Sequence, residues 1–262
     1  MNDVFKAVAC DIALYAGEIM LDNFSFQTQT DYKADNSPIT IADTTINSYV
    51  INQIQEKFPE HSIYGEEQSM YVEGSEYLWV CDPIDGTIPF SRGIPTNVFS
   101  LALVKDELPI LAVVYDPYTK RLYSAEKGKG AFVNNEPLHV SKKTKLDHTT
   151  IVSAPTWPNM QFPTYDLHPY IVRSGGYTLD FHSTVNAGMM VAAGKFEAMV
   201  FGGTTAHDVA TVKLIVEEAG GKVTNIFGEE QSYTKVIDGA IASNGVLHDE
   251  IISIVKEQCL NV

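Results

Sequence analysis

Residues 79–87 read WVCDPIDGT, an apolar run followed by two aspartates, Asp82 and Asp85, and then a Gly-Thr pair. The apolar run predicts a strand that holds the two carboxylates rigidly. Gly86 and Thr87 predict the start of a helix, where backbone N–H groups can donate to a phosphate oxygen. Carboxylates and a backbone carbonyl that converge on one point suit a hard cation such as Mg²⁺. A cation site beside an anion site indicates phosphoryl chemistry.

The same short motif has a simpler interpretation, because Asp-Pro and Asp-Gly are common in turns and an aspartate often caps a helix. Other acidic residues in the chain favour a metal site over this simpler interpretation. Asp43 precedes a helical pattern, Glu66 follows a short apolar step, and Asp208 introduces another amphipathic helix. Each acid alone is typical of a cap or a solvated surface. Together with Asp82 and Asp85, at element boundaries in four separate segments, they predict a metal site.

These segments resemble those of the inositol monophosphatase family. The likeness rests on D-P-I-D-G-T preceded by G-E-E, a distant H-D-V-A before an E-A-G-G helix end, and residues 128–134, which read GKGAFVN. It runs from about Lys33 to Lys222. The resemblance implies a Mg²⁺-dependent phosphatase, often lithium-sensitive, whose fold stacks helix and sheet layers with the metals at their junction.

The resemblance also assigns ligands by position. The implied metal ligands are Glu66, Asp82, Asp85 and Asp208, together with the backbone carbonyl of Ile84. Asp82 would bridge two ions, Glu66 would serve the first, and the other two aspartates the second. Two or three Mg²⁺ ions per site are therefore expected.

Catalytic roles follow from the same comparison. Thr87 and Asp43 would orient and deprotonate the attacking water. Glu66 is also expected to be a catalytic residue. Lys33 would hold a mobile loop over the site, although a solvated loop lysine is an open alternative. The residues expected to contact the substrate or its phosphate are Asp85, Gly86, Thr87, Arg173, Phe201 and Asp208.

The substrate is where this chain departs from the family pattern. Phe201 stands where inositol-specific members carry a glutamate, and a phenyl ring cannot accept a hydrogen bond from a polyol. It could stack on a flatter leaving group or simply belong to the core. Arg92 lies in an F-x-x-G-x-P segment similar to histidinol-phosphatase-like relatives, and Arg173 in a loop similar to the family's pocket loop. Weaker pocket candidates are Tyr177, Asp180, His182 and His207.

The expected function is therefore Mg²⁺-dependent hydrolysis of a small phosphorylated metabolite, such as an inositol-1-phosphate-like polyol or a sugar phosphate. Alternative substrates within the same family are histidinol phosphate, fructose 1,6-bisphosphate, and 3'-phosphoadenosine 5'-phosphate or NADP. A non-catalytic protein that binds Mg²⁺ or a phosphorylated metabolite is a further alternative, which the complete set of ligands disfavours.

The predicted fold class is α+β, layered αβαβα as in sugar phosphatases. Helical patterns at 2–24 and 43–57 precede a strand-rich stretch whose turn spacing predicts a mainly antiparallel sheet. Later the pattern changes to alternating strands and helices, including a strand at 236–242. We therefore expect an N-terminal α+β half over 1–140 and an α/β half over 141–262, which carries Asp208 and the pocket loop.

Composition limits the partners. The chain has 262 residues and a formal net charge of −15, which disfavours binding to nucleic acid or to an anionic membrane. Cys10, Cys81 and Cys259 lack any C-x-x-C spacing and are expected to be free thiols in a reducing compartment. No apolar run is long enough for a bilayer span. We expect a cytoplasmic protein and, from the resemblance, a homodimer.

Overall fold

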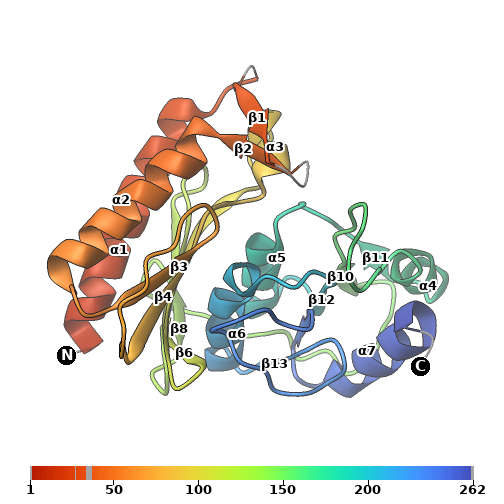
Figure 1. Cartoon of the computed structure of the whole chain (residues 1–262). Coiled ribbons are helices and arrows are strands. Elements are labelled where there is room, and N and C mark those ends of the chain that lie inside the picture. The colour runs from red at the N-terminus through yellow and green to blue at the C-terminus, as the bar shows by residue number, and fades with distance from the viewer. Residues whose placement is uncertain (1, 27, 34–36, 261–262) are drawn as a thin grey trace.

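The computed structural model describes residues 2–26, 28–33 and 37–260, and its layers alternate between helices and sheets (Figure 1). The helices are α1 (Asn2–Asn23), α2 (Ile41–Lys57), α3 (Thr87–Ser91), α4 (Leu167–Arg173), α5 (Thr184–Ala192), α6 (Ala210–Glu218) and α7 (His248–Val255), with a 3-10 turn η1 (Ala206–Asp208) and a π-helical end η2 (Lys256–Leu260). α1 and α2 cover one face of the first sheet, and α5 and α6 lie between the two sheets. α4 and α7 cover the second sheet, so the predicted αβαβα order is confirmed.

The first sheet has seven strands in the order β3-β4-β5-β6-β7-β8-β9. Their bounds are β3 (Ser62–Gly65), β4 (Tyr77–Asp85), β5 (Val98–Lys105), β6 (Leu108–Asp116), β7 (Arg121–Glu126), β8 (Ala131–Val133) and β9 (Glu136–Pro137). β3 pairs with β4 in parallel, and every later neighbour is antiparallel. The mainly antiparallel sheet predicted from the turn spacing is therefore confirmed.

Both faces of this sheet are buried, which explains why its central strands are largely apolar. In β4, Trp79 and Cys81 pack with α1 and α2, whereas Val80 between them faces α5 and α6. Successive side chains of a strand point to opposite faces, so a strand covered on both sides must be apolar at every position. This rigid strand carries the aspartates of the motif at its end.

The second sheet has five strands in the order β11-β10-β12-β14-β13. They are β10 (Ile151–Ser153), β11 (Tyr177–Thr178), β12 (Ala198–Phe201), β13 (Lys222–Thr224) and β14 (Ala240–Ser243). β10 pairs in parallel with β11 and β12, and β14 pairs antiparallel with β12 and β13. One hydrophobic cluster joins side chains of both sheets to α5 and α6. The division into halves at residue 140 stays a prediction.

Some elements differ from the sequence prediction. The strand expected over 236–242 is confined to β14, and the hairpin of β1 (Thr30–Tyr32) and β2 (Pro38–Thr40) was not predicted. These strands have three or four residues, too few to show a reliable period of two. Lys33 follows β1 in this hairpin, and the next residues, 34–36, lie outside the described part of the chain.

Two expectations from composition can be compared with the structure. Within the described ranges, no helix has both the length and the apolar character needed to cross a bilayer. Cys10, Cys81 and Cys259 are free thiols, as predicted.

The close packing of α5 on α6 depends on Gly188. A Cβ at this position would lie 2.6 Å from both Cγ atoms of Val212. We expect Gly188→Ala to lower the free energy of unfolding by about 1–3 kcal/mol, because the extra carbon overpacks a buried helix contact. Urea denaturation measures this loss.

The matched control is the double variant Gly188→Ala with Val212→Ala, which reopens space for the new methyl group. Its loss should be smaller than the sum of the two single losses. Strictly additive losses would contradict this account of the packing.

Candidate active site

The end of β4 carries two carboxylates, Asp82 and Asp85. The strand continues through the motif to Asp85, and its pairing with β5 becomes irregular between Asp82 and Asp85. The backbone N–H of Ile84 donates to Asp82 Oδ1 at 3.0 Å. Gly86 then has a φ of 97° and precedes α3, and a Cβ there would lie 3.0 Å from a backbone oxygen of His182. The motif therefore needs glycine at this turn for both backbone angle and space.

Asp85 is held by the beginning of α5. The backbone N–H groups of Thr184 and Val185 donate to its carboxylate at 3.1 and 2.8 Å, and the hydroxyl of Ser183 donates as well. The carboxylate therefore lies where a helix favours negative charge. This contact links the end of the first sheet to a helix of the central layer.

Asp208 approaches the same point from the opposite side. It ends η1, just before α6, and it accepts a hydrogen bond from the hydroxyl of Thr205. One oxygen each from Asp82, Asp85 and Asp208 lie within 4.8 Å of one another. The fold therefore brings Asp208 to the two aspartates of the motif, more than 120 residues earlier in the chain.

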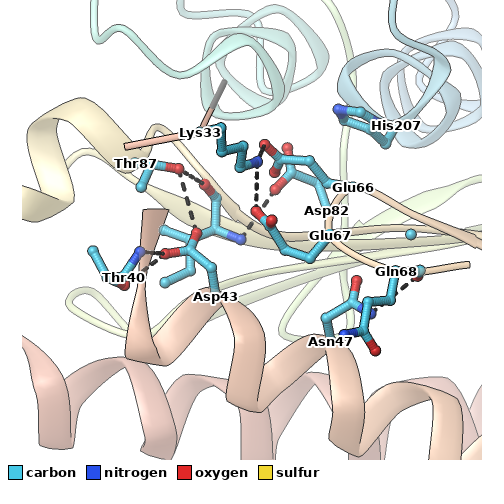
Figure 2. Close-up of polar contacts among 12 residues, drawn as sticks. Lys33, Thr40, Asp43, Asn47, Glu66, Glu67, Gln68, Asp82, Thr87 and His207 are labelled. Carbon is cyan, nitrogen blue, oxygen red and sulfur yellow. Dashed lines mark hydrogen bonds and ion pairs between the residues drawn. The ribbon is translucent and has the colours of Figure 1, made fainter. Parts of the chain in front are cut away.

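Asp43 lies beside this group and is completely buried. It is the third residue of α2, and its carboxylate accepts hydrogen bonds from the backbone N–H and hydroxyl of Thr40, at 2.8 and 2.5 Å. The Thr87 hydroxyl lies 3.3 Å from Asp43 Oδ1 and 3.2 Å from the carbonyl oxygen of Ile84 (Figure 2). Burial raises the pKa of Asp43 to about 6, although the bonds from Thr40 favour the charged form.

Lys33 points into the site and meets two glutamates. Its Nζ lies 2.8 Å from Glu66 Oε1 and 2.6 Å from Glu67 Oε1 (Figure 2). Burial alone would lower the pKa of Lys33, but its attraction to Glu66 and its bonds to both glutamates raise that pKa overall. The lysine is therefore firmly charged, and its charge is already engaged by carboxylates.

Most of these side chains line a cavity of about 480 Å³, although Asp43 and Glu67 are not among the described lining residues. Among the described residues that line it, Lys33 is the single lysine or arginine. The lining residues are Lys33, Ser37, Pro38, Tyr64, Glu66, Asp82, Ile84, Asp85, Gly86, Thr87, Ile88, Pro155, Trp157, His182, Thr184, Phe201, Thr205, His207 and Asp208.

The clustered acids are costly to ionise together. Burial raises the pKa of Asp82 well above its usual value, and the nearby charges of Glu66 and Asp85 raise it further. Burial likewise raises the pKa of Asp85 and of Asp208 to about 7, and Asp208 adds to the effect on Asp85. Divalent cations would remove this repulsion, and oxygen donors are the ligands that hard cations prefer. The donor set therefore fits a metal site.

Phe201 and Trp157 form an aromatic part of the cavity wall. Their ring centroids lie 5.7 Å apart, and Phe201 is almost fully buried although it borders the cavity. The sequence left open whether this phenylalanine belongs to the core or to the pocket, and it contributes to both. Trp157 follows β10 in a loop and is only partly buried.

Arg173 is not among the described residues that line the cavity. It ends α4 in the outer helical layer and is exposed. Its contact with substrate, which the resemblance of its loop to the family implies, stays a prediction. Arg92, which follows α3, is also exposed and outside this lining set. Tyr177 and Asp180 are not among the described lining residues either. Of the weaker candidates, His182 and His207 line the cavity.

Several supporting residues were not predicted from the sequence. Ser183 and Thr205 donate to the aspartates, and Glu67 pairs with Lys33. A partial signal existed for one of them, because Ser183 precedes a helical pattern as N-cap residues do. Their bonds to distant acids could not be seen, since these contacts join segments far apart in the chain.

Comparisons with known proteins agree with this geometry. The model of the inositol monophosphatase family matches residues 1–259. A fructose-1,6-bisphosphatase/inositol-1-monophosphatase of Aquifex aeolicus is 31% identical, over 97% of this chain and 96% of that protein. An IMPase structure from Thermotoga maritima has a TM-score of 0.87 and 27% identity, with 98% of each chain covered.

A third relative is described as an IMPase/NADP phosphatase complexed with Mg²⁺ and phosphate, with a TM-score of 0.81, 25% identity, and coverage of 97% of this chain and 95% of that one. With these matches along nearly its whole length, and with a cluster of acids suited to metal, the chain belongs to the inositol monophosphatase family and is a phosphatase that hydrolyses phosphomonoesters.

Proposed function

We propose that this protein is a Mg²⁺-dependent phosphomonoesterase that acts on a small phosphorylated metabolite, such as an inositol-1-phosphate-like polyol phosphate or a sugar phosphate. One observation carries the proposal. The cavity is bordered by Glu66, Asp82, Asp85 and Asp208, while the charge of Lys33 is already paired with glutamates. A phosphate dianion would be repelled from such a cavity unless bound cations reversed its charge.

Two or three Mg²⁺ ions would be held by five groups, with Asp82 shared between two of them. These groups are Glu66, Asp82, Asp85, Asp208 and the carbonyl of Ile84. When bound, the ions offset the negative charge of the phosphate and make water a stronger nucleophile at neutral pH. Gly86 and Thr87 border the same point of the cavity and are proposed to contact the phosphate.

The protein's own base is proposed to be the pair of Thr87 and Asp43. The Thr87 hydroxyl can donate to Asp43, which leaves its oxygen lone pairs to accept a hydrogen bond from the attacking water. As water attacks phosphorus, its proton passes to Thr87 while the Thr87 proton passes to Asp43. The bond from phosphorus to the ester oxygen breaks, and the leaving alkoxide, whose charge bound cations would offset, takes a proton from solvent. A carboxylate whose pKa is raised to about 6 suits this role, because a base works best near the ambient pH. Lys33 is proposed to fix Glu66 and Glu67 in place.

The aromatic wall supports a second substrate class. Trp157 and Phe201 offer ring faces and no hydrogen-bond acceptor to a polyol on that side. A leaving group with a flat ring, as in histidinol phosphate or in a 3'-phosphoadenosine 5'-phosphate or NADP-like nucleotide, would stack there. Fructose 1,6-bisphosphate is a further alternative, for which a second cationic group is needed and Arg173 is poorly placed.

Phosphate release from a panel of inositol, sugar, histidinol and nucleotide phosphates, with and without Mg²⁺, tests the proposal. We expect release that depends on Mg²⁺ and is strongest for one class of leaving group. In Trp157→Ala, kcat/KM should fall about 5- to 150-fold for flat leaving groups and little for polyols, because base–aromatic stacking contributes about 1–3 kcal/mol. No release from any panel member while Mg²⁺ binds would refute the proposed activity.

Replacement of Thr87 separates water activation from metal binding. Thr87→Ala should lower kcat by at least about 100-fold, the usual contribution of general acid–base groups, and should change Mg²⁺ affinity little. Thr87→Ser keeps the hydroxyl and is the matched control. Steady-state kinetics with metal-titration calorimetry measures both quantities, and an unaltered kcat in Thr87→Ala would remove this residue from the mechanism.

The raised pKa values predict how Mg²⁺ stabilises the protein at different pH. The pKa of Asp85 and Asp208 rises from 3.8 to about 7 on folding. Without metal, stability should therefore fall as pH rises from about 4 to 7, since folding opposes ionisation of these acids. Mg²⁺ binds the ionised carboxylates, so its stabilisation should be full above pH 7 and should shrink toward pH 5.

Thermal unfolding with and without Mg²⁺ checks this expectation. At a hundred times Kd the gain is about 2.7 kcal/mol, which raises Tm by roughly 5–10 °C at pH 8. Asp82→Asn is the control and should lose most of the gain. Equal gains at pH 5 and pH 8 would contradict the linkage.

Three expectations from the sequence stay predictions, namely a homodimer, a cytoplasmic location and sensitivity to lithium. Neither the contacts within this chain nor its relatives' names test them. Light scattering and inhibition by Li⁺ are the direct measurements for the first and the third.

A further inference from the structure

His207 is a buried imidazole at the edge of the proposed metal centre. It lies in η1, one residue before Asp208, and only 8% of its surface is exposed. Its ring meets the ring of Tyr64 edge-on, with centroids 5.9 Å apart. The ring is therefore held in place by packing, and it borders the cavity.

Among the described residues, nothing forms a hydrogen bond that would explain the burial of one nitrogen of this ring. Nδ1 is buried and has no hydrogen-bond partner among the described residues. Nε2 lies 3.7 Å from Asp208 Oδ2, beyond the range of a hydrogen bond. Buried polar atoms are nearly always paired, so an unpaired ring nitrogen at a cavity wall indicates a missing ligand.

The surroundings of His207 supply the other donors of a cation site. One atom each from Glu66, Asp82 and His207 lie within 4.8 Å of one another, a set distinct from the group of three aspartates. In Figure 2, the His207 ring lies on the side of Glu66 that is away from Asp43. Ligand bonds of about 2.0–2.2 Å place opposite ligands about 4 Å apart, so small side-chain movements suffice to share an ion.

Imidazole is a common metal ligand in proteins, because a ring nitrogen that carries no proton offers a lone pair for coordination.

We propose that His207 is a nitrogen ligand of the cation held by Glu66 and Asp82, so that this position binds Mn²⁺ in preference to Mg²⁺. Mn²⁺ shares the preference of Mg²⁺ for carboxylate oxygens but, as a first-row transition ion, accepts an imidazole nitrogen beside them more readily than Mg²⁺ does. The group of Asp82, Asp85 and Asp208, which has only oxygen donors, keeps its suitability for Mg²⁺. The inference rests on the proposed metal centre and names the chemistry of one of its positions.

Pulsed electron paramagnetic resonance of the full-length protein loaded with Mn²⁺ tests this directly, because a coordinated imidazole gives a ¹⁴N coupling. We expect the coupling in the unaltered protein and its loss in His207→Phe and in His207→Gln. His182→Asn is the matched control, since His182 borders the same cavity, and it should keep the coupling. The Kd for Mn²⁺ should rise about tenfold or more in both His207 variants, and the Kd for Mg²⁺ by less than about threefold.

Absence of ¹⁴N coupling in the unaltered protein with Mn²⁺ bound would overturn the proposal, as would coupling that survives both His207 variants. Equal losses of Mn²⁺ and Mg²⁺ affinity would also overturn it, since they would make His207 a support for Asp208. If circular dichroism shows that His207→Phe does not fold, His207→Gln decides. This experiment does not measure phosphate release. If the ¹⁴N coupling is present in a protein that releases no phosphate, the result refutes the proposed activity and leaves the assignment of His207 intact.

Discussion

Repulsion between buried carboxylates is the constraint on which the site depends. Asp82, Asp85 and Asp208 are brought within a few ångströms of one another, where ionisation of all three is strongly opposed. The fold offsets part of this cost with donors aimed at the acids, such as the start of α5 for Asp85 and Thr205 for Asp208. The remainder is the driving force for binding divalent cations, so a group that would destabilise a metal-free protein becomes a reason for metal affinity.

The layers make this convergence possible. β4 is buried on both faces and therefore rigid, and it delivers two of the acids at its end. α5 touches this end with its first residues, and η1 leads into α6 beside it. Because α5 and α6 are packed between both sheets, the ligands from the two sides of the cavity are fixed relative to one another. Tight contacts such as that of Gly188 with Val212 thus support the site from a distance.

Different residues of the cavity wall are proposed to serve the reaction and the choice of leaving group. The lining includes acids, Thr87 and Lys33, the groups proposed for catalysis, and it also includes Trp157 and Phe201, which give part of the wall its aromatic character. A family match therefore identifies the reaction more readily than the leaving group. His207 adds a nitrogen donor to a region otherwise built from oxygen donors, which bears on which ions the site selects.

The sequence by itself determined the central strands, their mainly antiparallel sheet and the acids at element boundaries, and its resemblance to the family implied the layered class. Long apolar runs, helical periodicity and the D-P-I-D-G-T motif are local signals, and the resemblance ordered them. Only the tertiary structure decided that Asp85 is held by α5, that Arg173 lies outside the cavity lining and that Trp157 joins Phe201. It also placed His207 beside Glu66 and Asp82. The physical reason is that these contacts join segments many residues apart, whose distances depend on how the layers pack and leave no trace in any local pattern.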